Sequence, residues 1–234
     1  MRGRRFGIAL AASLAGSAAA IFAVASSAHA AVIVADADTY VRGGTFSGAA
    51  HGGDDIVRVE RDPTYGRRFR AGVMRFDLST FAPGSLTDAT LNLTQASDGA
   101  QQVRVFGVAD GLDGWDEALL SLTQGTSLLG GTAFTDLGTI DLAAGGYGAT
   151  LSLTGTALLN FLNAPGADGL VSFVLLSTQP ANGSSARFAS RENGSLAGPS
   201  LDVTVASPVP VPPAAALFGS VLLATRLKRN ISST

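Results

Sequence analysis

Short stretches in which apolar and polar residues alternate dominate the middle of the 234-residue chain, and this period of two predicts β-strands. Within Gly72–Leu78, for example, Met74 and Phe76 fall on one face and Arg75 falls on the other. Glycines and Asp-Gly pairs separate the stretches, as is typical of turns. The pattern predicts strands at Ile56–Glu60, Gly72–Leu78, Ala89–Thr94, Gln102–Val108, Thr150–Leu153, Leu170–Ser177 and Ser200–Val205.

Two segments refine this prediction. Leu170–Ser177 is apolar on both faces except for its serines, which predicts a central strand that is covered on both sides. Thr156–Asn163 carries apolar residues at helical spacing and predicts one short helix. About nine to eleven short strands with one helix predict an all-β fold, an antiparallel, jelly-roll-like β-sandwich, over residues 31–206.

Residues 1–30 predict a secretory signal peptide. Three arginines precede the apolar run Phe6–Val24, and the small residues Ala28 and Ala30 precede an expected cleavage before Ala31. An uncleaved anchor helix is the alternative.

Residues 207–234 predict a sorting segment. Closely spaced prolines form an extended spacer, because proline fixes φ and lacks a backbone donor. The apolar stretch Ala214–Ala224 follows and is too short to cross a bilayer, which takes about 20 residues. A basic cluster then closes the segment, at Arg226, Lys228 and Arg229. A helix packed on the domain is the alternative.

This segment resembles the PEP-CTERM sorting signal of Gram-negative bacteria, in its Val-Pro-x-Pro variants. Pro210, Val211 and Pro212 stand where many members have Pro-Glu-Pro, so the acidic residue is missing. The resemblance implies transient membrane insertion of the apolar helix and removal of the segment by an exosortase-type protease. It also implies an exported protein at the cell surface, in the outer envelope or in the extracellular matrix of a Gram-negative bacterium.

Charge is distributed unevenly along the chain. Six of the 16 basic residues lie in the two terminal segments, which leaves ten arginines and no lysine against 18 acidic residues between them. This acidic balance argues against nucleic acid as a partner. Cysteine is absent, which excludes disulfides and thiol chemistry. His51 is the only histidine after residue 30, so a Ser/His/Asp arrangement is not expected.

Several motifs follow one another in the predicted sandwich. They are Asp38–Gly44, Arg70–Ser79 followed by Ala89–Leu91, Trp115 with Glu117, and Phe188–Glu192 followed by Pro199–Leu201. In this order they resemble the DNRLRE domain, also classed as carbohydrate-binding module family 96. The resemblance spans residues 35–205 and departs from the family at Leu119–Leu122, where many members have Thr-Trp-Asn. It implies a non-catalytic β-sandwich that binds carbohydrate.

Positive charge is concentrated in one part of this domain. Tyr65 offers a face for a sugar ring there, and Arg191 is expected to join from a later strand. Because guanidinium groups pair bidentately with carboxylates, this region predicts a site for an acidic polysaccharide such as a uronate polymer. Five arginines lie within thirteen residues, at Arg58, Arg61, Arg67, Arg68 and Arg70.

An alternative interpretation pairs these arginines with acidic neighbours on the surface. Each exposed pair would stabilise the fold by only about 0–1 kcal/mol. The available partners are Asp54, Asp55, Glu60 and Asp62.

Aspartates near the start of the domain are candidates for a structural Ca²⁺ site, because Ca²⁺ takes carboxylate and carbonyl oxygens from flexible loops. The glycine-rich loop Gly43–Asp55 offers carbonyl groups, and solvated turn residues are the alternative. The candidate ligands are Asp36, Asp38, Asp54 and Asp55.

Catalysis is not expected. Asp113, Asp116 and Glu117 surround Trp115, but carboxylates so close in sequence on one loop rarely converge as a glycosidase pair, and a core role is expected for Trp115. Two functions remain: a non-catalytic, surface-sorted protein that binds acidic polysaccharide in an extracellular or biofilm matrix, and a structural or adhesive surface protein that binds no glycan.

Overall fold

The computed structural model contains eleven β-strands in the part of the chain that it describes. The described residues are 28–61, 66–125, 127–129, 134–164, 166, 168–179 and 185–206. The strands are β1 (His29–Val34), β2 (Ala37–Arg42), β3 (Ile56–Val59), β4 (Arg70–Asp77), β5 (Leu86–Thr94), β6 (Gln101–Val108), β7 (Phe134–Leu142), β8 (Thr150–Thr154), β9 (Leu170–Ser177), β10 (Ala186–Ala189) and β11 (Ser200–Val205). A 3₁₀ turn, Gly44–Phe46, follows β2, and the helix α1 spans Thr156–Leu162.

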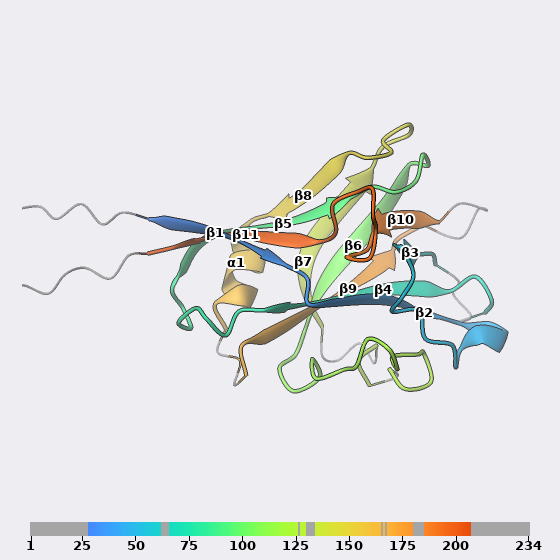
Figure 1. Ribbon diagram of the computed structural model, residues 1–234, viewed down its shortest axis with the longest axis horizontal. Helices are drawn as coiled ribbons and strands as arrows, with labels where there is room; N and C mark the ends of the chain where they lie inside the picture. The colour runs from blue at the N-terminus through green and yellow to red at the C-terminus, as the bar shows by residue number, and fades with distance from the viewer. Residues whose placement is uncertain are drawn as a thin grey trace, which may run out of the picture. The chain divides into compact units, whose positions relative to one another are not determined.

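The strands form two antiparallel sheets that face each other (Figure 1). One sheet has four strands in the order β1-β11-β5-β8, and the other has five in the order β2-β4-β9-β6-β7. A two-stranded ribbon, β3 with β10, lies beside both. A bridge between Glu60 and Arg70 joins it to β4, and one between Gln95 and Phe188 joins it to the end of β5. The predicted all-β sandwich with one short helix is confirmed.

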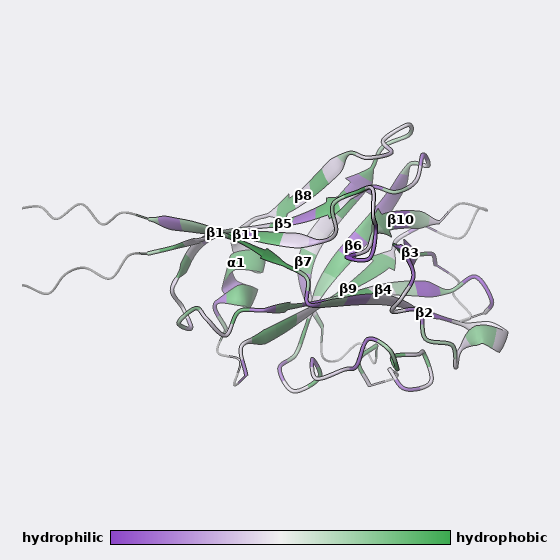
Figure 2. Cartoon of the chain, viewed as in Figure 1, coloured by the Kyte–Doolittle hydropathy of each residue, from purple (hydrophilic) through white to green (hydrophobic). Residues whose placement is uncertain are grey.

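The main hydrophobic core fills the space between the two sheets (Figure 2). Phe76 and Phe173 meet there edge to face, with ring centroids 5.6 Å apart. Helix α1 closes one end of the core, because it buries Leu158 and Leu162 and brings Phe161 against Phe173. The apolar positions that the sequence places on one face of each strand are therefore the positions that hold the sheets together.

A second hydrophobic cluster covers the outer face of the five-stranded sheet. Val73 and Val174 of that sheet pack there with Trp115 and Leu120, which come from the long segment between β6 and β7. Figure 1 shows this segment beneath β2, β4 and β9. Strand β9 is central and buried on both faces, as the sequence predicts.

Four strands were not found by the alternation: β1, β2, β7 and β10. Strand β2 is expected only from the family resemblance of Asp38–Gly44. Strand β7 contains Gly138 at φ 132°, beside a register shift opposite Val105 and Phe106, and this bulge interrupts its period of two. Strand β10 has only four residues. Strand β1 spans the predicted cleavage site, because His29 and Ala30 pair with β11. Cleavage before Ala31 would therefore remove two residues from this strand.

Most of the predicted signal peptide and the whole C-terminal sorting motif, including Pro210, Val211, Pro212, Arg226, Lys228 and Arg229, lie outside the described residues. Within the described part of the chain, no helix combines the length and apolar character that crossing a membrane requires.

Candidate functional site

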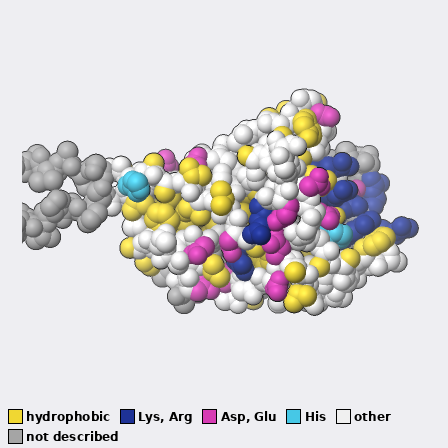
Figure 3. Space-filling model, in the orientation of Figure 1, with side chains coloured by type: hydrophobic (Ala, Val, Ile, Leu, Met, Phe, Trp, Pro, Cys, Tyr) yellow, Lys and Arg dark blue, Asp and Glu magenta, His cyan; other side chains and the backbone are white. Residues whose placement is uncertain are grey.

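Six arginines surround one open pocket of about 330 Å³, where the β3–β10 ribbon meets β2 and β4. Their side chains form the dark blue patch at the right of Figure 3. Among the described residues, the carboxylate of Glu60 is the one that lies among them. More than half of the ten arginines between the terminal segments therefore meet at one place in an acidic domain. We call this site the arginine pocket; it is lined by Arg42, Arg58, Glu60, Arg67, Arg68, Arg70, Ser185 and Arg187.

Strand register forces four of these arginines into like-charged pairs. Arg42 lies directly opposite Arg70 in the β2–β4 ladder, and Arg58 lies directly opposite Arg187 in the β3–β10 ladder. Like charges that face each other across a ladder destabilise a sheet. The register cannot slip to relieve this repulsion, since a shift by one residue would expose the buried Val57.

Glu60 compensates part of the charge. Its carboxylate pairs with the Arg70 guanidinium and accepts a hydrogen bond from Arg68 Nε at 2.9 Å. Burial lowers the pKa of Arg70, and the nearby charges of Arg42 and Arg58 lower it further. In the part of the pocket that the structure describes, this one carboxylate faces six guanidinium groups, so most of their positive charge is unbalanced there.

The remaining guanidinium groups have few partners in the described part of the chain. Arg42 lies over the ring of Phe46, with 3.9 Å between its central carbon and the ring centroid. The Nε atoms of Arg42, Arg58 and Arg70 are buried and form no hydrogen bond with the described residues. The pocket therefore presents positive charge that an anionic ligand can balance.

The structure brings together four of the arginines predicted from sequence: Arg58, Arg67, Arg68 and Arg70. It corrects the prediction for two others. Arg61 turns away and donates to the carbonyl oxygen of Thr178 at 2.9 Å, and Arg191 lies among carboxylates elsewhere. Tyr65 lies outside the described residues.

Arg42 and Arg187 were missed because nothing in the local sequence indicates that their strands face Arg70 and Arg58. The alternative in which surface acids neutralise the arginines holds only for Glu60 among the described residues. Asp54, for example, instead accepts a hydrogen bond from the Tyr40 hydroxyl at 2.7 Å.

A second hollow adjoins the arginine pocket. It has a volume of about 420 Å³ and shares Ser185 and Arg187 with the first. The ring of Tyr147 lies in its wall and is 59% exposed, on a turn that links β7 to β8. An exposed aromatic ring beside a cationic pocket offers a flat apolar surface to a ligand that extends beyond the arginines. Sequence analysis did not single out Tyr147.

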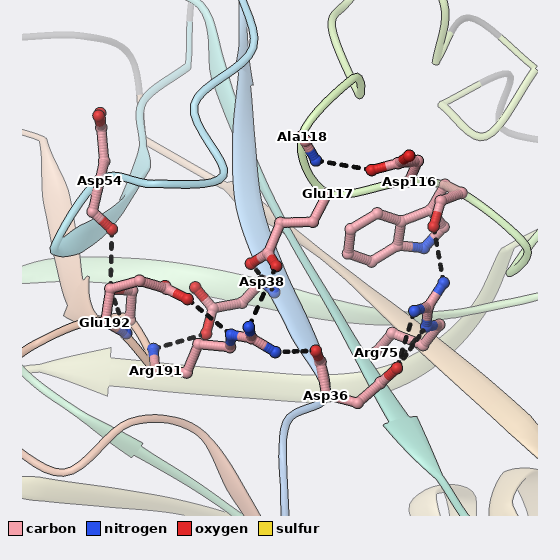
Figure 4. Close-up of polar contacts among 11 residues, drawn as sticks. Asp36, Asp38, Asp54, Arg75, Asp116, Glu117, Ala118, Arg191 and Glu192 are labelled. Atoms are coloured by element: carbon pink, nitrogen blue, oxygen red, sulfur yellow. Dashed lines mark hydrogen bonds and ion pairs between the residues drawn. The ribbon is translucent and has the colours of Figure 1, made fainter.

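A separate polar network surrounds Asp38, whose side chain is almost fully buried (Figure 4). Asp38 Oδ2 accepts a hydrogen bond from the backbone N–H of Arg191 at 2.7 Å, and the backbone N–H of Asp38 donates to Glu117 at 2.9 Å. Burial raises the pKa of Asp38 to about 7, and the charges of Glu192 and Glu117 contribute. The Arg191 guanidinium lies between these two glutamates, at 2.6 Å from Glu192 and 3.6 Å from Glu117.

Arg75 extends this network to the segment between β6 and β7. Its guanidinium pairs with Asp36 at 2.7 Å and donates to the carbonyl oxygens of Asp113 at 3.2 Å and Trp115 at 2.6 Å. The indole N–H of Trp115 donates to Ser172 Oγ at 3.0 Å, and its ring is buried in the second cluster. Trp115 is thus a core residue, as expected, and the network fixes the segment to the sheet.

The four predicted Ca²⁺ ligands do not come together. Asp36 pairs with Arg75. Asp54 Oδ2 accepts a hydrogen bond from the Tyr40 hydroxyl and lies 3.3 Å from His51 Nδ1. The Asp55 carbonyl oxygen, rather than its carboxylate, accepts a hydrogen bond from Asn193 at 2.9 Å. Asp38 groups with Glu117 and Glu192, with one carboxylate oxygen of each within 4.8 Å of the others. Since Arg191 already supplies positive charge there, this group has a counter-cation of its own.

Comparison with known families supports a binding role. Residues 29–124 match the family model of carbohydrate-binding module family 96. The resemblance to this family is confirmed. The match includes both arginines of the Arg42–Arg70 pair, together with the Trp115 and Glu117 motif. Family 96 modules bind carbohydrate and are non-catalytic, which agrees with the expectation that this chain is not an enzyme.

Other comparisons add little. No curated protein matches the chain significantly. Among solved structures, a chain of the mud crab tombus-like virus, determined by cryo-electron microscopy, is 14% identical. That comparison covers 92% of this chain and 96% of the viral chain, with a TM-score of 0.25.

The buried carboxyl group of Asp38 predicts a pH-dependent stability. Its pKa is about 7 in the folded protein against an ordinary value of 3.8, so the folded state binds more protons between these two pH values. Stability should therefore fall as the pH rises from about 4 to about 7, by an amount on the order of 4 kcal/mol. Asp38→Asn keeps an acceptor for the Arg191 N–H, so it should raise the melting temperature at pH 8 and flatten the pH profile.

Thermal unfolding followed by circular dichroism between pH 4 and pH 8 measures this effect. Asp141→Asn, at an exposed position on β7, is the matched control and should leave the profile unchanged. A melting temperature at pH 8 that is lower in Asp38→Asn than in the wild type would contradict the account.

Proposed function

We propose that the protein binds an acidic polysaccharide at the arginine pocket. The observation that carries the proposal is the presence of two like-charged arginine pairs, Arg42 with Arg70 and Arg58 with Arg187, at one pocket of an otherwise acidic domain. A fold that holds such pairs together gains stability from any anion that enters between them. The match to a carbohydrate-binding family supports a glycan as the source of that anion.

The chemistry of the pocket favours a polymer that carries carboxylates at regular intervals. Guanidinium groups bind carboxylates through two parallel hydrogen bonds, and several guanidinium groups can engage successive sugar acids. The adjoining hollow gives the polysaccharide a path past Arg187 to Tyr147. There a pyranose ring can stack on the exposed phenol ring, because the apolar face of a sugar packs well on an aromatic side chain.

A non-catalytic role is consistent with the carboxylates near Trp115. Asp113 is buried, Asp116 accepts a hydrogen bond from the backbone N–H of Ala118 at 2.9 Å, and Glu117 accepts the N–H of Asp38. Each of the three therefore has its own structural surroundings, and they do not flank a common space as the acid and base of a glycosidase do.

A structural or adhesive role without glycan binding is the second candidate, and strand β1 favours it. This strand is an edge of the four-stranded sheet, and its residues Val32 and Val34 are each about 70% exposed. Edge strands with exposed apolar side chains can pair with another chain. In this alternative the sandwich would contact proteins, and the arginine pocket would have no glycan ligand.

Substituting exposed arginines of the pocket tests the binding proposal. The double variant Arg67→Gln, Arg187→Gln should bind alginate with at least about tenfold lower affinity, because each charge-assisted hydrogen bond is worth about 1.5–3 kcal/mol. It should therefore be less retarded in alginate-containing gels. Tyr147→Ala should weaken binding of long chains more than binding of short oligomers. Arg104→Gln, an exposed arginine on β6 that pairs with Asp136, is the matched control and should bind normally.

Affinity electrophoresis against alginate, other uronates and neutral glycans gives the measurement. Retardation that is equal in the double variant and the wild type would remove the arginine pocket as the site. If no glycan retards the wild-type protein, the structural or adhesive role is favoured instead.

We further infer that the protein is exported and sorted to the cell surface or matrix of a Gram-negative bacterium by an exosortase-type protease. The support is the arrangement of the sequence at both ends, with a signal-peptide pattern before the sandwich and a proline, apolar and basic segment after it. Transient membrane insertion of the C-terminal apolar segment belongs to the same proposal.

Cell fractionation with an antibody against the sandwich tests the export proposal. We expect a product in the envelope or medium that is shorter than the 234-residue chain at both ends. A full-length, uncut product inside the cell would contradict it.

A further inference from the structure

A second group of three carboxylates shares no residue with the arginine pocket and adjoins the polar network, because the carbonyl oxygen of Asp113 accepts a hydrogen bond from Arg75. Asp110 and Asp113 belong to the segment that follows β6, and Asp168 belongs to the turn that precedes β9. One carboxylate oxygen of each lies within 4.8 Å of the other two. Three negative charges so close together repel one another unless a cation or protons lie between them.

Asp113 is the member of this group that points to a ligand. Its side chain is 2% exposed, and Oδ1 is buried without a hydrogen-bond partner among the described residues. Burial raises the pKa of Asp113, and the charges of Asp168 and Asp110 raise it further. Backbone N–H groups of Asp113 and Gly111 oppose this effect in part. Asp113 thus places a buried carboxyl group that has an unbonded oxygen beside two other carboxylates, and this is the position of a metal ligand.

The surroundings of this group differ from those of Asp38. There the Arg191 guanidinium lies between Glu117 and Glu192 and balances their charge. Neither Asp113 nor Asp168 forms an ion pair with an arginine in the described part of the chain. The Asp168 carboxylate accepts a hydrogen bond from the backbone N–H of Leu170, at 3.0 Å.

We propose that Asp110, Asp113 and Asp168 bind a Ca²⁺ ion. Ca²⁺ takes six to eight oxygen ligands in flexible geometry, and it accepts carboxylates together with backbone carbonyls and water. Mg²⁺ is less suitable because it demands a near-ideal octahedron. A hydrated ion can approach from the adjoining pocket of about 210 Å³, whose wall includes Asp110, Asp113 and Gly166.

The position of the site gives the ion a structural effect. Asp110 and Asp113 precede Trp115, whose ring covers the outer face of the five-stranded sheet. Asp168 precedes β9, the central strand of that sheet. A shared ion would therefore connect the covering segment to the strand beneath it. This connection would lie before Trp115 in sequence, whereas the Glu117 contact lies after it. Ca²⁺ binding should stabilise the second hydrophobic cluster.

Calcium titration of the full chain after treatment with EDTA tests the proposal. Isothermal titration calorimetry should detect one Ca²⁺ per chain, and a hundredfold excess of Ca²⁺ over its Kd should raise the melting temperature by roughly 5–10 °C. Asp113→Asn and Asp168→Asn should each lower the Ca²⁺ affinity at least about tenfold. Asp168 is exposed, so its variant remains informative if Asp113→Asn folds poorly.

Two comparisons make the assignment specific. In EDTA, Asp113→Asn should melt above the wild type, because it removes a buried charge that no ion then balances. The double variant Glu117→Gln, Glu192→Gln alters the other acidic group and should keep wild-type Ca²⁺ affinity. The proposal is overturned if the wild type binds no Ca²⁺, if Asp113→Asn and Asp168→Asn bind it normally, or if the double variant loses it.

Discussion

Repulsion between arginines that face each other across paired strands is the interaction on which the proposed function depends. Arg42 opposes Arg70, and Arg58 opposes Arg187, in ladders whose register the buried core fixes. A directly opposed like-charged pair opposes folding by up to about 1 kcal/mol. Buried residues such as Val57 and Phe188 outweigh this cost, since burial of one large apolar side chain contributes about 1.5–3 kcal/mol. The core therefore holds a charged site that would not form by itself.

The architecture explains why this charge accumulates in one place. The β3–β10 ribbon contributes one arginine pair, and the β2–β4 ladder contributes the other. The bridge between Glu60 and Arg70 joins the two pairs, and Glu60 supplies a carboxylate to the pocket. Elsewhere some acidic residues meet single arginines, as Asp36 meets Arg75, some accept hydrogen bonds from uncharged groups, as Asp54 does from Tyr40, and some gather in groups of three. Separation of the two signs of charge gives an acidic domain one local attraction for anions.

Sequence analysis found the fold more readily than the site. Alternation depends on neighbours in the chain, so β4, β5, β9 and β11 could be predicted with nearly correct bounds. The arginine pocket depends on register between strands far apart in sequence, and Arg42 and Arg187 could not be found without it. Arg191 is an instructive error: its charge suggested the pocket, but the strand it follows places it beside Glu117 and Glu192.

The same reasoning applies to the acidic residues. Asp36, Asp38, Asp54 and Asp55 are near one another in sequence, but each has different partners in the fold. The two groups of carboxylates that do converge join residues from distant segments, such as Asp113 with Asp168. A cluster of carboxylates in sequence is thus a weak guide to a cluster in space.

The central claim is that the pocket recognises the negative charge of a glycan. Calorimetric titration of the protein with polygalacturonate, and with the same polymer after full methyl esterification, isolates that charge while it keeps the sugar backbone. The account predicts binding to the acid form that weakens as salt is added, and no binding to the neutral ester. Equal affinity for both polymers, or binding to the acid form that salt leaves unchanged, would contradict it.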